Sequence, residues 1–395
     1  MFVLKRVLIL PFLVTAILFG FTNSTAQEDG DIPAVTTELA TTYDRTMAEI
    51  MKKHGVYTIG VGVIKNGELV WDGYYGEQAP GVPASNETLF NVASITKTIS
   101  SEAILHMVEE GRFELDESMA PYWVDPDLET DPRHEVLTPR MTLNHSTGFP
   151  NWRFMDPEGT LKFVNEPGTS FGYSGEGFEY VMQYAAKRLD SHPDELVKNY
   201  IFDAFGMESA SYTVDESLFD RIAHPRDENG KVYNPYCFPG GDCKQEGAFS
   251  AADDLVINVE DYARSLISVM NETGLSKELV EERNRVQTTK PADFQIVNCS
   301  SDTDQVCPET QGFGLGWEVL DYGDTQVLSH GGSDWAELTL GYFYTKSKDG
   351  LIIFFNGPNS ASVRAMYETL HLMDPDSPMI GGYGRWVAYL DSEEN

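Results

Sequence analysis

The chain has 395 residues, with 62 acidic against 28 basic side chains and a formal net charge of −34 at pH 7. This excess of acid disfavours binding to nucleic acid and to anionic membrane surfaces, because both interactions depend on Lys and Arg, so we expect neither as a partner. The length exceeds a typical single hydrophobic core, and we expect two subdomains, or one domain with a large insertion.

The N-terminus has the pattern of an export signal. Two basic residues precede an apolar run at 7–21, and small residues at 24–26 occupy the positions that a signal peptidase reads. We therefore predict that residues 1–26 are a cleaved signal peptide and that the protein is secreted or periplasmic. The alternative is an uncleaved membrane anchor, which Pro11 and the short apolar run disfavour. After cleavage we expect no membrane contact.

The residues after the signal begin with a polar stretch, 27–40, which we interpret as a linker. A first helix is predicted over 41–54. Two segments rich in β-branched and aromatic residues, 57–64 and 69–75, flank an Asn-Gly pair that is typical of a tight hairpin. Two antiparallel strands therefore follow the first helix.

The middle of the chain is dominated by helical patterns. Apolar side chains recur at helical spacing over 90–107, so we predict a helix there. A short helix within 137–151 contains His145 and ends before a Gly-Phe-Pro segment. Two further amphipathic helices are predicted over 178–189 and 193–204.

The last third returns to strands. A helix over 252–270 is followed by four segments bounded by turn residues at hairpin spacing, and these predicted strands cover 316–320, 326–329, 336–344 and 351–356. A closing helix is predicted over 362–373. We interpret residues 375–395 as a polar C-terminal tail.

Antiparallel strands near both ends of a chain can join into one sheet. We therefore expect an α+β fold whose single domain spans 41–374. Its α/β part would comprise about 41–125 and 250–374, and an inserted helical part about 126–249. The active cleft would lie between the two parts.

The four cysteines fall into two close pairs, Cys237 with Cys243 and Cys299 with Cys307, each within a loop. In an oxidising compartment we expect local pairing within each loop, although three connectivities are formally possible. Zinc is the rival explanation, but there is no CxxC motif and no His at ligand spacing nearby. We therefore expect no metal.

The most plausible chemical centre is Ser94-Ile95-Thr96-Lys97. On a helix, Ser94 and Lys97 stand one turn apart on the same face, so the hydroxyl and the amine can meet. A serine hydroxyl is a poor nucleophile until a neighbouring base takes its proton, and a lysine can do so only if burial or nearby cations disfavour its charged form. Ser94 is therefore a candidate nucleophile in a dry pocket.

Three separated stretches can supply the parts of a serine hydrolase, namely Ser94 with Lys97, Tyr173-Ser174-Gly175, and His330-Gly331-Gly332-Ser333. In this order they resemble the active-site boxes of the class C β-lactamase and penicillin-binding-protein superfamily, including its esterase and D-aminopeptidase branches. Segments 143–148, 312–317 and 329–332 also resemble sequence motifs of this family, and the similarity runs from about 41 to 373. The resemblance implies a β-lactamase/transpeptidase-like fold, an antiparallel sheet flanked by helices, and no cofactor.

By this resemblance Ser94 is acylated, and Lys97 and Tyr173 share its proton and pass it to the leaving group. Which of these two is the general base stays open. The backbone amides of Ser94 and Ser333 would form the oxyanion hole, and His330 would complete the catalytic set at the strand edge. The resemblance also implies that His145 is structural and supports the helix after the nucleophile.

The candidate substrate-binding residues are Gly175, Gly331, Gly332, Trp152 and Trp335. Two of the motifs depart from the family pattern. The second box usually ends in Asn or Ser, whose side chain binds the substrate amide, and Gly175 cannot do this. The third box has a lysine in β-lactamases, where this chain has His330, which is largely neutral at pH 7. Both departures weaken recognition of β-lactams.

We therefore expect an exported serine hydrolase that cleaves an ester, amide or peptide bond of a small molecule through an acyl-serine intermediate, most plausibly with esterase-like specificity. The first alternative is β-lactamase or D-amino-acid peptidase activity on cell-wall-type substrates. The second is a penicillin-binding or sensor module without turnover. The third is a Ser-His-Asp hydrolase that uses Ser174, which Glu176 disfavours because a nucleophile elbow requires glycine there.

Overall fold

The computed structural model describes residues 32–302 and 305–393, so the predicted signal peptide lies outside the described residues. The helices of this part are α1 (Thr37–His54), α2 (Thr96–Glu109), α3 (Pro139–Leu143), α4 (Gly175–Leu189), α5 (Pro193–Val197), α6 (Asp203–Phe205), α7 (Val259–Met270), α8 (Lys277–Asn284), α9 (Asn359–Met373) and α10 (Met379–Glu393). The strands are β1 (Thr58–Lys65), β2 (Glu68–Ala79), β3 (Val82–Pro83), β4 (Phe90–Asn91), β5 (Val256–Ile257), β6 (Thr310–Phe313), β7 (Glu318–Asp321), β8 (Gln326–Ser333), β9 (Glu337–Tyr344) and β10 (Gly350–Asn356). Within the described ranges, no helix has the length and apolar character needed to cross a bilayer.

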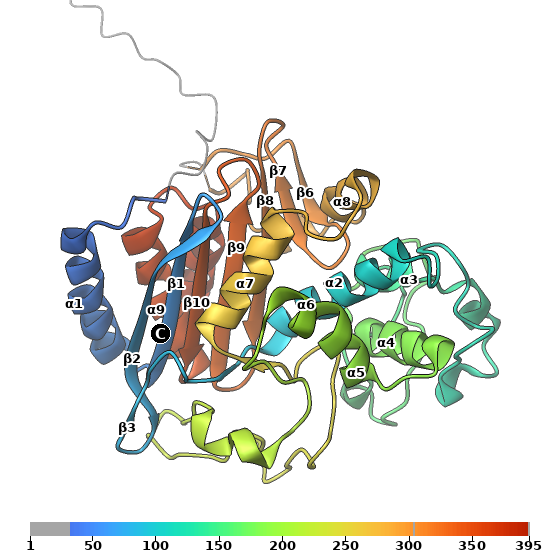
Figure 1. Cartoon of the computed structure of the whole chain (residues 1–395), viewed down its shortest axis with the longest axis horizontal. Coiled ribbons are helices and arrows are strands. Elements are labelled where there is room, and N and C mark those ends of the chain that lie inside the picture. The colour runs from blue at the N-terminus through green and yellow to red at the C-terminus, as the bar shows by residue number, and fades with distance from the viewer. Residues whose placement is uncertain (1–31, 303–304, 394–395) are drawn as a thin grey trace, which may run out of the picture.

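Eight of the strands form one antiparallel sheet in the order β3-β2-β1-β10-β9-β8-β7-β6 (Figure 1). The N-terminal β1 pairs with the C-terminal β10, from Thr58 opposite Asn356 to Ile64 opposite Gly350. The prediction that strands from both ends of the chain join into one sheet is confirmed. The β1–β2 hairpin is also confirmed, and its turn places Asn66 and Gly67 at φ of 51° and 77°, as a tight hairpin turn requires.

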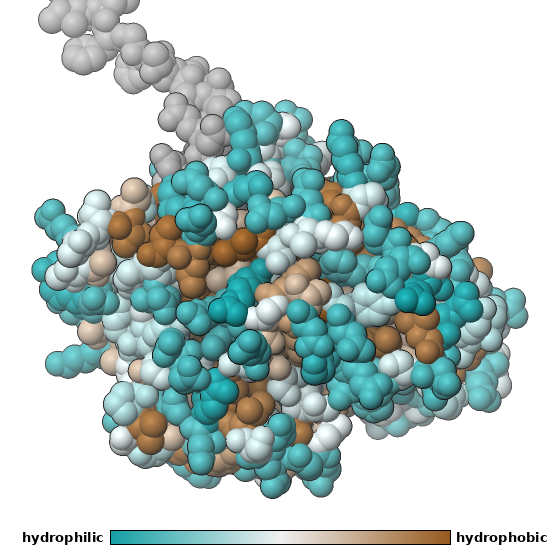
Figure 2. Space-filling model, viewed as in Figure 1, coloured by the Kyte–Doolittle hydropathy of each residue, from teal (hydrophilic) through white to brown (hydrophobic). Residues whose placement is uncertain are grey.

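The two faces of the sheet pack against different helices. Met47 of α1 and Met366 of α9 join a buried cluster with β-strand residues on one face. On the other face Leu266 of α7 and Ile99 of α2 join a cluster with Phe354. Each fully buried large apolar side chain contributes roughly 1.5–3 kcal/mol. Hydrophilic side chains cover much of the face seen in Figure 2, with hydrophobic side chains gathered in a few patches between them.

Several element boundaries differ from the predictions because of capping side chains. The helix α1 begins at Thr37, inside the predicted linker, because the Thr36 hydroxyl accepts a hydrogen bond from the Leu39 amide at 3.2 Å. The helix predicted from 252 begins only at Val259, because Asn258 caps it. His145 lies beyond the end of α3, with a φ of 58°.

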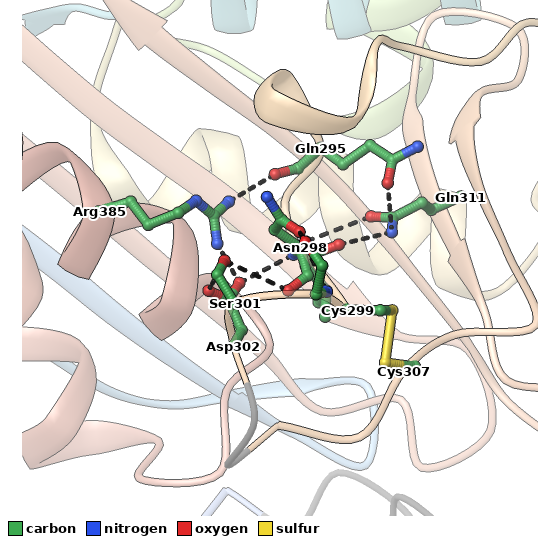
Figure 3. Close-up of a disulfide and its surroundings, with 10 residues drawn as sticks. Gln295, Asn298, Cys299, Ser301, Asp302, Cys307, Gln311 and Arg385 are labelled. Atoms are coloured by element: carbon green, nitrogen blue, oxygen red, sulfur yellow. Dashed lines mark hydrogen bonds and ion pairs between the residues drawn. A yellow bond between two sulfur atoms is a disulfide. The ribbon is translucent and has the colours of Figure 1, made fainter.

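The interpretation of residues 375–395 as a polar tail is wrong for 379–393, which form α10. This helix packs beside α9, and its side chain Val387 contacts the apolar layer on that face of the sheet. Arg385 forms an ion pair with Asp302 and donates to the Gln295 carbonyl at 2.6 Å (Figure 3). The helix therefore exists because tertiary partners hold it.

The predicted helical part is only partly helical. Helices α3 to α6 lie beside α2 at one end of the molecule (Figure 1). Between α6 and β5 the chain forms turns, isolated bridges and the 3-10 helix Glu216–Arg221 instead. Both predicted local disulfides, Cys237–Cys243 and Cys299–Cys307, are present.

Candidate active site

Ser94 lies in a strained turn immediately before α2. The preceding residue, Ala93, has a φ of 46°, a left-handed conformation that side-chain-bearing residues rarely adopt. The Asn91 side chain stabilises this turn by accepting from the Ala93 amide at 2.9 Å. Among the described residues, the Ile95 amide donates to the Val92 carbonyl, whereas the Ser94 amide donates to no backbone carbonyl of this turn. Such strain accumulates at functional sites, and Ser94 itself is only partly buried.

Lys97 is completely buried and approaches Ser94 closely. Its Nζ lies 3.0 Å from the Ser94 Oγ and donates to the Ala252 carbonyl at 2.9 Å. The Nζ also lies 5.0 Å from the centroid of the Tyr173 ring and 5.7 Å from that of Trp152. Aromatic faces replace part of the water that a cation loses on burial. The predicted pairing of the hydroxyl with the amine is confirmed.

Tyr173 is held next to Lys97 by His145. The two rings lie 4.3 Å apart with an interplanar angle of 30°, and the His145 Nδ1 accepts from the Ser174 amide at 3.1 Å. Burial, with the nearby charge of Lys97, holds the pKa of His145 well below its usual range. The imidazole is therefore neutral and can accept this bond. These contacts favour the interpretation of His145 as structural, and they join it to the Tyr173 loop.

Ser174 caps a helix. Its hydroxyl donates to the Pro150 carbonyl at 2.7 Å and accepts from the Gly177 amide at 3.0 Å, and only 1% of the residue is exposed. Both functions of the hydroxyl are used in starting α4. Ser174 is therefore not available as the nucleophile of a Ser-His-Asp hydrolase.

The end of β8 forms an open strand edge beside Ser94. Pairing with β7 ends at Ser329, whereas pairing with β9 continues to Ser333. A Cβ atom on Gly332 would lie 3.0 Å from the Ser94 amide nitrogen and 2.2 Å from the Val92 carbonyl oxygen. Glycine therefore allows β8 to touch the Ser94 turn, and the Ser333 amide follows one residue later.

His330 points from this strand into the buried side of the site. Burial and then the charge of Lys97 lower its pKa to about 3, so the ring is neutral at pH 7. Its Nδ1 bonds to the Gly331 carbonyl at 2.7 Å, and its Nε2 is buried without a partner in the described part of the chain. A neutral ring cannot replace the fixed ammonium that holds a carboxylate in the family pattern.

Gly175 and Trp152 meet on the opposite wall. A Cβ atom on Gly175 would lie 2.6 Å from the Trp152 ring, so this ring fills the space that a larger second-box side chain would need. The neighbouring Arg153 fixes this segment through ion pairs with Glu176 at 2.7 Å and Asp125 at 2.8 Å.

The remaining predicted substrate residues lie around the end of β8. Trp335 packs edge-on against the Tyr233 ring, with centroids 5.0 Å apart. The Ser333 hydroxyl lies 3.4 Å from the Asn359 side chain. The side of Gly331 on which a Cβ atom would lie faces Tyr383 of α10 rather than Ser94.

The sequence analysis did not predict the buried carboxyl groups that lie near the connection between β8 and β9. Burial, with the charge of Asp334, raises the pKa of Glu337 to about 8. Burial also raises the pKa of Asp253 to about 6, although the charges of Lys97 and Lys244 act in the opposite direction. The only sequence signal was the overall excess of acid. The carbonyl of Ala252 was also missed, because backbone acceptors leave no trace in a sequence.

The comparisons with known proteins agree with this geometry. Residues 43–372 match the family described as Beta-lactamase, and the chain therefore belongs to the β-lactamase family of serine hydrolases. It is 22% identical over 235 residues to a β-lactamase of Pseudomonas fluorescens, an alignment that covers 57% of this chain and 64% of that protein. The chain thus spans less than two thirds of that relative. It is also 21% identical over 196 residues to a β-lactamase of Yersinia enterocolitica, an alignment that covers 47% of this chain and 50% of that protein.

Solved structures share the fold. The octameric penicillin-binding protein homologue from Pyrococcus abyssi has a TM-score of 0.68 at 21% identity, with 86% of this chain and 78% of that chain covered. D-amino acid amidase from Ochrobactrum anthropi SV3, complexed with L-phenylalanine, has a TM-score of 0.63 at 17% identity, with 80% and 91% covered. The predicted β-lactamase/transpeptidase-like fold is confirmed.

Proposed function

We propose that this protein is an exported serine hydrolase that cleaves a small ester or amide through an acyl-Ser94 intermediate, with a preference for esters. The observation that carries the proposal is the 3.0 Å contact between the Lys97 Nζ and the Ser94 Oγ. The amine is buried, and its hydrogen-bond partners in the described part of the chain are a hydroxyl and a carbonyl rather than a carboxylate. It is therefore placed to exchange a proton with Ser94.

In the proposed reaction the Ser94 Oγ attacks the substrate carbonyl while one member of the Lys97–Tyr173 pair, in its deprotonated form, accepts the proton of the hydroxyl. The amides of Ser94 and Ser333 stabilise the negative oxygen of the tetrahedral intermediate. The bond to the leaving group then breaks, and the leaving group departs with the proton from the shuttle. Water, activated by the same pair, hydrolyses the acyl ester. A positioned base contributes about 10²–10⁴ in rate, and one oxyanion donor about 10²–10³.

The preference for esters is based on two substrate-binding side chains of the family pattern that this chain replaces, at Gly175 and at His330. Gly175 offers no side chain to an amide of the substrate, and Trp152 occupies the adjoining space. Neutral His330 offers no positive charge to a carboxylate. A penicillin or cephalosporin would therefore lose two of its usual contacts.

A second candidate is an amidase or aminopeptidase for substrates that carry a free ammonium group. The charges of Asp253 and Asp334 influence each other near the end of β8, and a cationic substrate would be attracted there. The likeness to a D-amino acid amidase fold agrees with this candidate.

A hydrolysis screen with labelling tests the proposal. Purified wild type, Ser94→Ala and the neighbouring control Ser174→Ala are assayed with p-nitrophenyl acetate, nitrocefin and D-phenylalanine amide. We expect ester hydrolysis by wild type and Ser174→Ala, little nitrocefin turnover, and a fluorophosphonate adduct on Ser94. Ester hydrolysis or labelling that survives in Ser94→Ala would refute the assignment. N-terminal sequencing of protein recovered from the periplasm or medium tests export separately.

A further inference from the structure

The segment 250–255 carries a backbone acceptor for the active-site amine. Its Ala252 carbonyl accepts from the Lys97 Nζ at 2.9 Å, and the same Nζ lies 3.0 Å from the Ser94 Oγ. A lysine ammonium sits on a flexible four-carbon stem, so its direction depends on the acceptors around it. The position of the Ala252 carbonyl therefore decides how well the amine is aimed at the Ser94 hydroxyl.

Two serine hydroxyls hold the peptide group that precedes this carbonyl. The Ser100 hydroxyl, on α2 like Lys97, donates to the Ala251 carbonyl at 2.6 Å. The Ser250 hydroxyl accepts from the Ala252 amide at 3.2 Å. The Ala251 carbonyl and the Ala252 amide belong to one peptide group, so this group is held at both of its polar atoms.

Glu179 anchors this peptide group from another helix. It lies on α4, which follows the Tyr173 loop and packs beside α2 (Figure 1). Its Oε1 accepts from the Ser250 hydroxyl at 2.5 Å. Because the hydroxyl hydrogen is directed at Glu179, a lone pair of the same oxygen is left for the Ala252 amide. Glu179 thus joins the helix behind Tyr173 to the segment that holds the amine.

The Glu179 carboxyl disfavours the folded state when it is ionised. Burial raises its pKa to about 7, although the Ser250 hydroxyl and the Ala251 amide act in the opposite direction. The charges of Asp254 and Glu176 raise this pKa further. Ionisation therefore lowers the free energy of unfolding as the pH rises from about 4.5 to about 7. An uncharged acceptor of the same shape would stabilise the fold better, which favours a role for Glu179 beyond stability.

The hydrogen bonds of these residues form one chain that ends at the active-site amine. We propose that Glu179 is a positioning residue: by fixing residues 250–252, it aims the Lys97 amine at the nucleophile. Glu179 touches neither the substrate nor the reacting atoms, and it acts only through the backbone of that segment. The inference rests on the proposed function, in which Lys97 exchanges a proton with the nucleophile.

Variants at Glu179 and Ser250 test the proposal. Glu179→Leu and Ser250→Ala each break the chain of hydrogen bonds, whereas Glu179→Gln keeps a carbonyl acceptor for the hydroxyl. A displacement of about 1 Å can cost about 10²-fold in rate. For p-nitrophenyl acetate we therefore expect kcat to fall about 10- to 100-fold in the first two variants, with KM changed less than about twofold. Glu179→Gln should keep at least about a third of the wild-type kcat. Should Glu179→Leu fail to fold, Ser250→Ala carries the test.

Two further measurements separate positioning from a purely structural role. The double variant Glu179→Leu with Ser250→Ala should lose at most about threefold more kcat than the less active single variant, because both changes break one chain. At pH 8, Glu179→Gln should unfold at the same temperature as wild type or higher, because it removes the unfavourable charge. Losses of kcat that multiply in the double variant would contradict the route through Ser250. Lower unfolding temperatures with an unchanged kcat would identify Glu179 as structural only.

The matched control is Glu117→Leu. This carboxyl also accepts from a hydroxyl, that of Tyr184 on α4, at 2.5 Å. Its removal should change kcat less than about twofold. A loss in the control as large as in Glu179→Leu would contradict the proposal, because it would show a general response of the helical part.

The outcomes for this inference and for the proposed function are distinct. Ser94-dependent hydrolysis with an unchanged kcat in Glu179→Leu and Ser250→Ala would overturn the inference and leave the proposed function standing. If wild type shows no Ser94-dependent hydrolysis, the proposed function fails. Crystal structures of wild type and Ser250→Ala then decide the positioning role. A Lys97 Nζ that stays within about 3.2 Å of the Ala252 carbonyl in the variant would overturn it, and a longer separation would support it.

Discussion

Gly331 and Gly332 are neighbours on β8, and the structure predicts opposite outcomes when each is replaced by alanine. At Gly332 the new Cβ would lie 2.2 Å from the Val92 carbonyl oxygen, 2.4 Å from the Thr339 hydroxyl and 3.0 Å from the Ser94 amide nitrogen. At Gly331 the nearest atom, the Thr339 carbonyl oxygen, would be 3.5 Å away, an ordinary contact.

The cost at Gly332 can be estimated from this overlap. Relieving it requires β8 and the Ser94 turn to separate by about 1 Å, because non-bonded carbon and oxygen atoms rarely approach below roughly 3.2 Å. A donor moved from about 3 Å to about 4 Å no longer forms a hydrogen bond. Loss of one oxyanion donor costs about 10²–10³ in kcat. We therefore expect Gly332→Ala to lose about 100-fold or more, and Gly331→Ala less than about threefold.

The assay is kcat and KM for p-nitrophenyl acetate, together with the midpoint of thermal unfolding and the rate of fluorophosphonate labelling. A folded Gly332→Ala variant with slow labelling and little change in KM would support the placement of the oxyanion donors. Equal activities of the two variants would refute the reasoning, because only the Cβ at position 332 is expected to clash with the Ser94 turn.

Three further predictions concern neighbouring features. Gly175→Asn should displace the Trp152 ring, which lies 2.6 Å from the new Cβ, and should lower kcat/KM at least about tenfold in steady-state kinetics. The double variant Gly175→Asn with Trp152→Ala should recover activity, because it removes the ring that causes the clash. Arg283→Met leaves the buried Glu102 carboxylate without its ion pair at 3.2 Å, so urea titration should give a loss of about 3–5 kcal/mol in unfolding free energy. His330 binds a proton below about pH 6.5 in the unfolded state but only below about pH 3 in the folded state. The free energy of unfolding should therefore decrease as the pH falls through this window, by about 2 kcal/mol at pH 5. In His330→Asn, urea titrations at several pH values should show a smaller dependence of the unfolding free energy on pH.

Local patterns in the sequence were sufficient for features made by residues close together in the chain. The Asn66-Gly67 turn, the two disulfide loops and the contact of Lys97 with Ser94 all join positions within a few residues. Such features depend on backbone geometry that a short segment imposes by itself. The joining of strands from both ends of the chain into one sheet was also predictable, because antiparallel strands at both ends can share one core.

Other features depended on contacts between distant segments, and no local pattern predicts these. The left-handed Ala93 and the glycine contact between β8 and the Ser94 turn arise only when strand and helix are packed together. The same is true of α10, which lies in the segment 375–395 that we interpreted as a polar tail. Its helical state depends on Arg385 and on apolar partners contributed by α9 and by residues near 295–302.

The sequence by itself determined the contact of Lys97 with Ser94, the family and the joining of strands from both ends of the chain into one sheet, because these are encoded in spacing and in hydrophobic pattern. Tertiary structure alone decided that the Cβ side of Gly332 and not of Gly331 faces Ser94, that His330 is buried and neutral, and that residues 379–393 form a helix that packs beside α9. The physical reason is that burial and steric exclusion are properties of the packed chain, and a residue acquires them only from neighbours that lie far away in sequence.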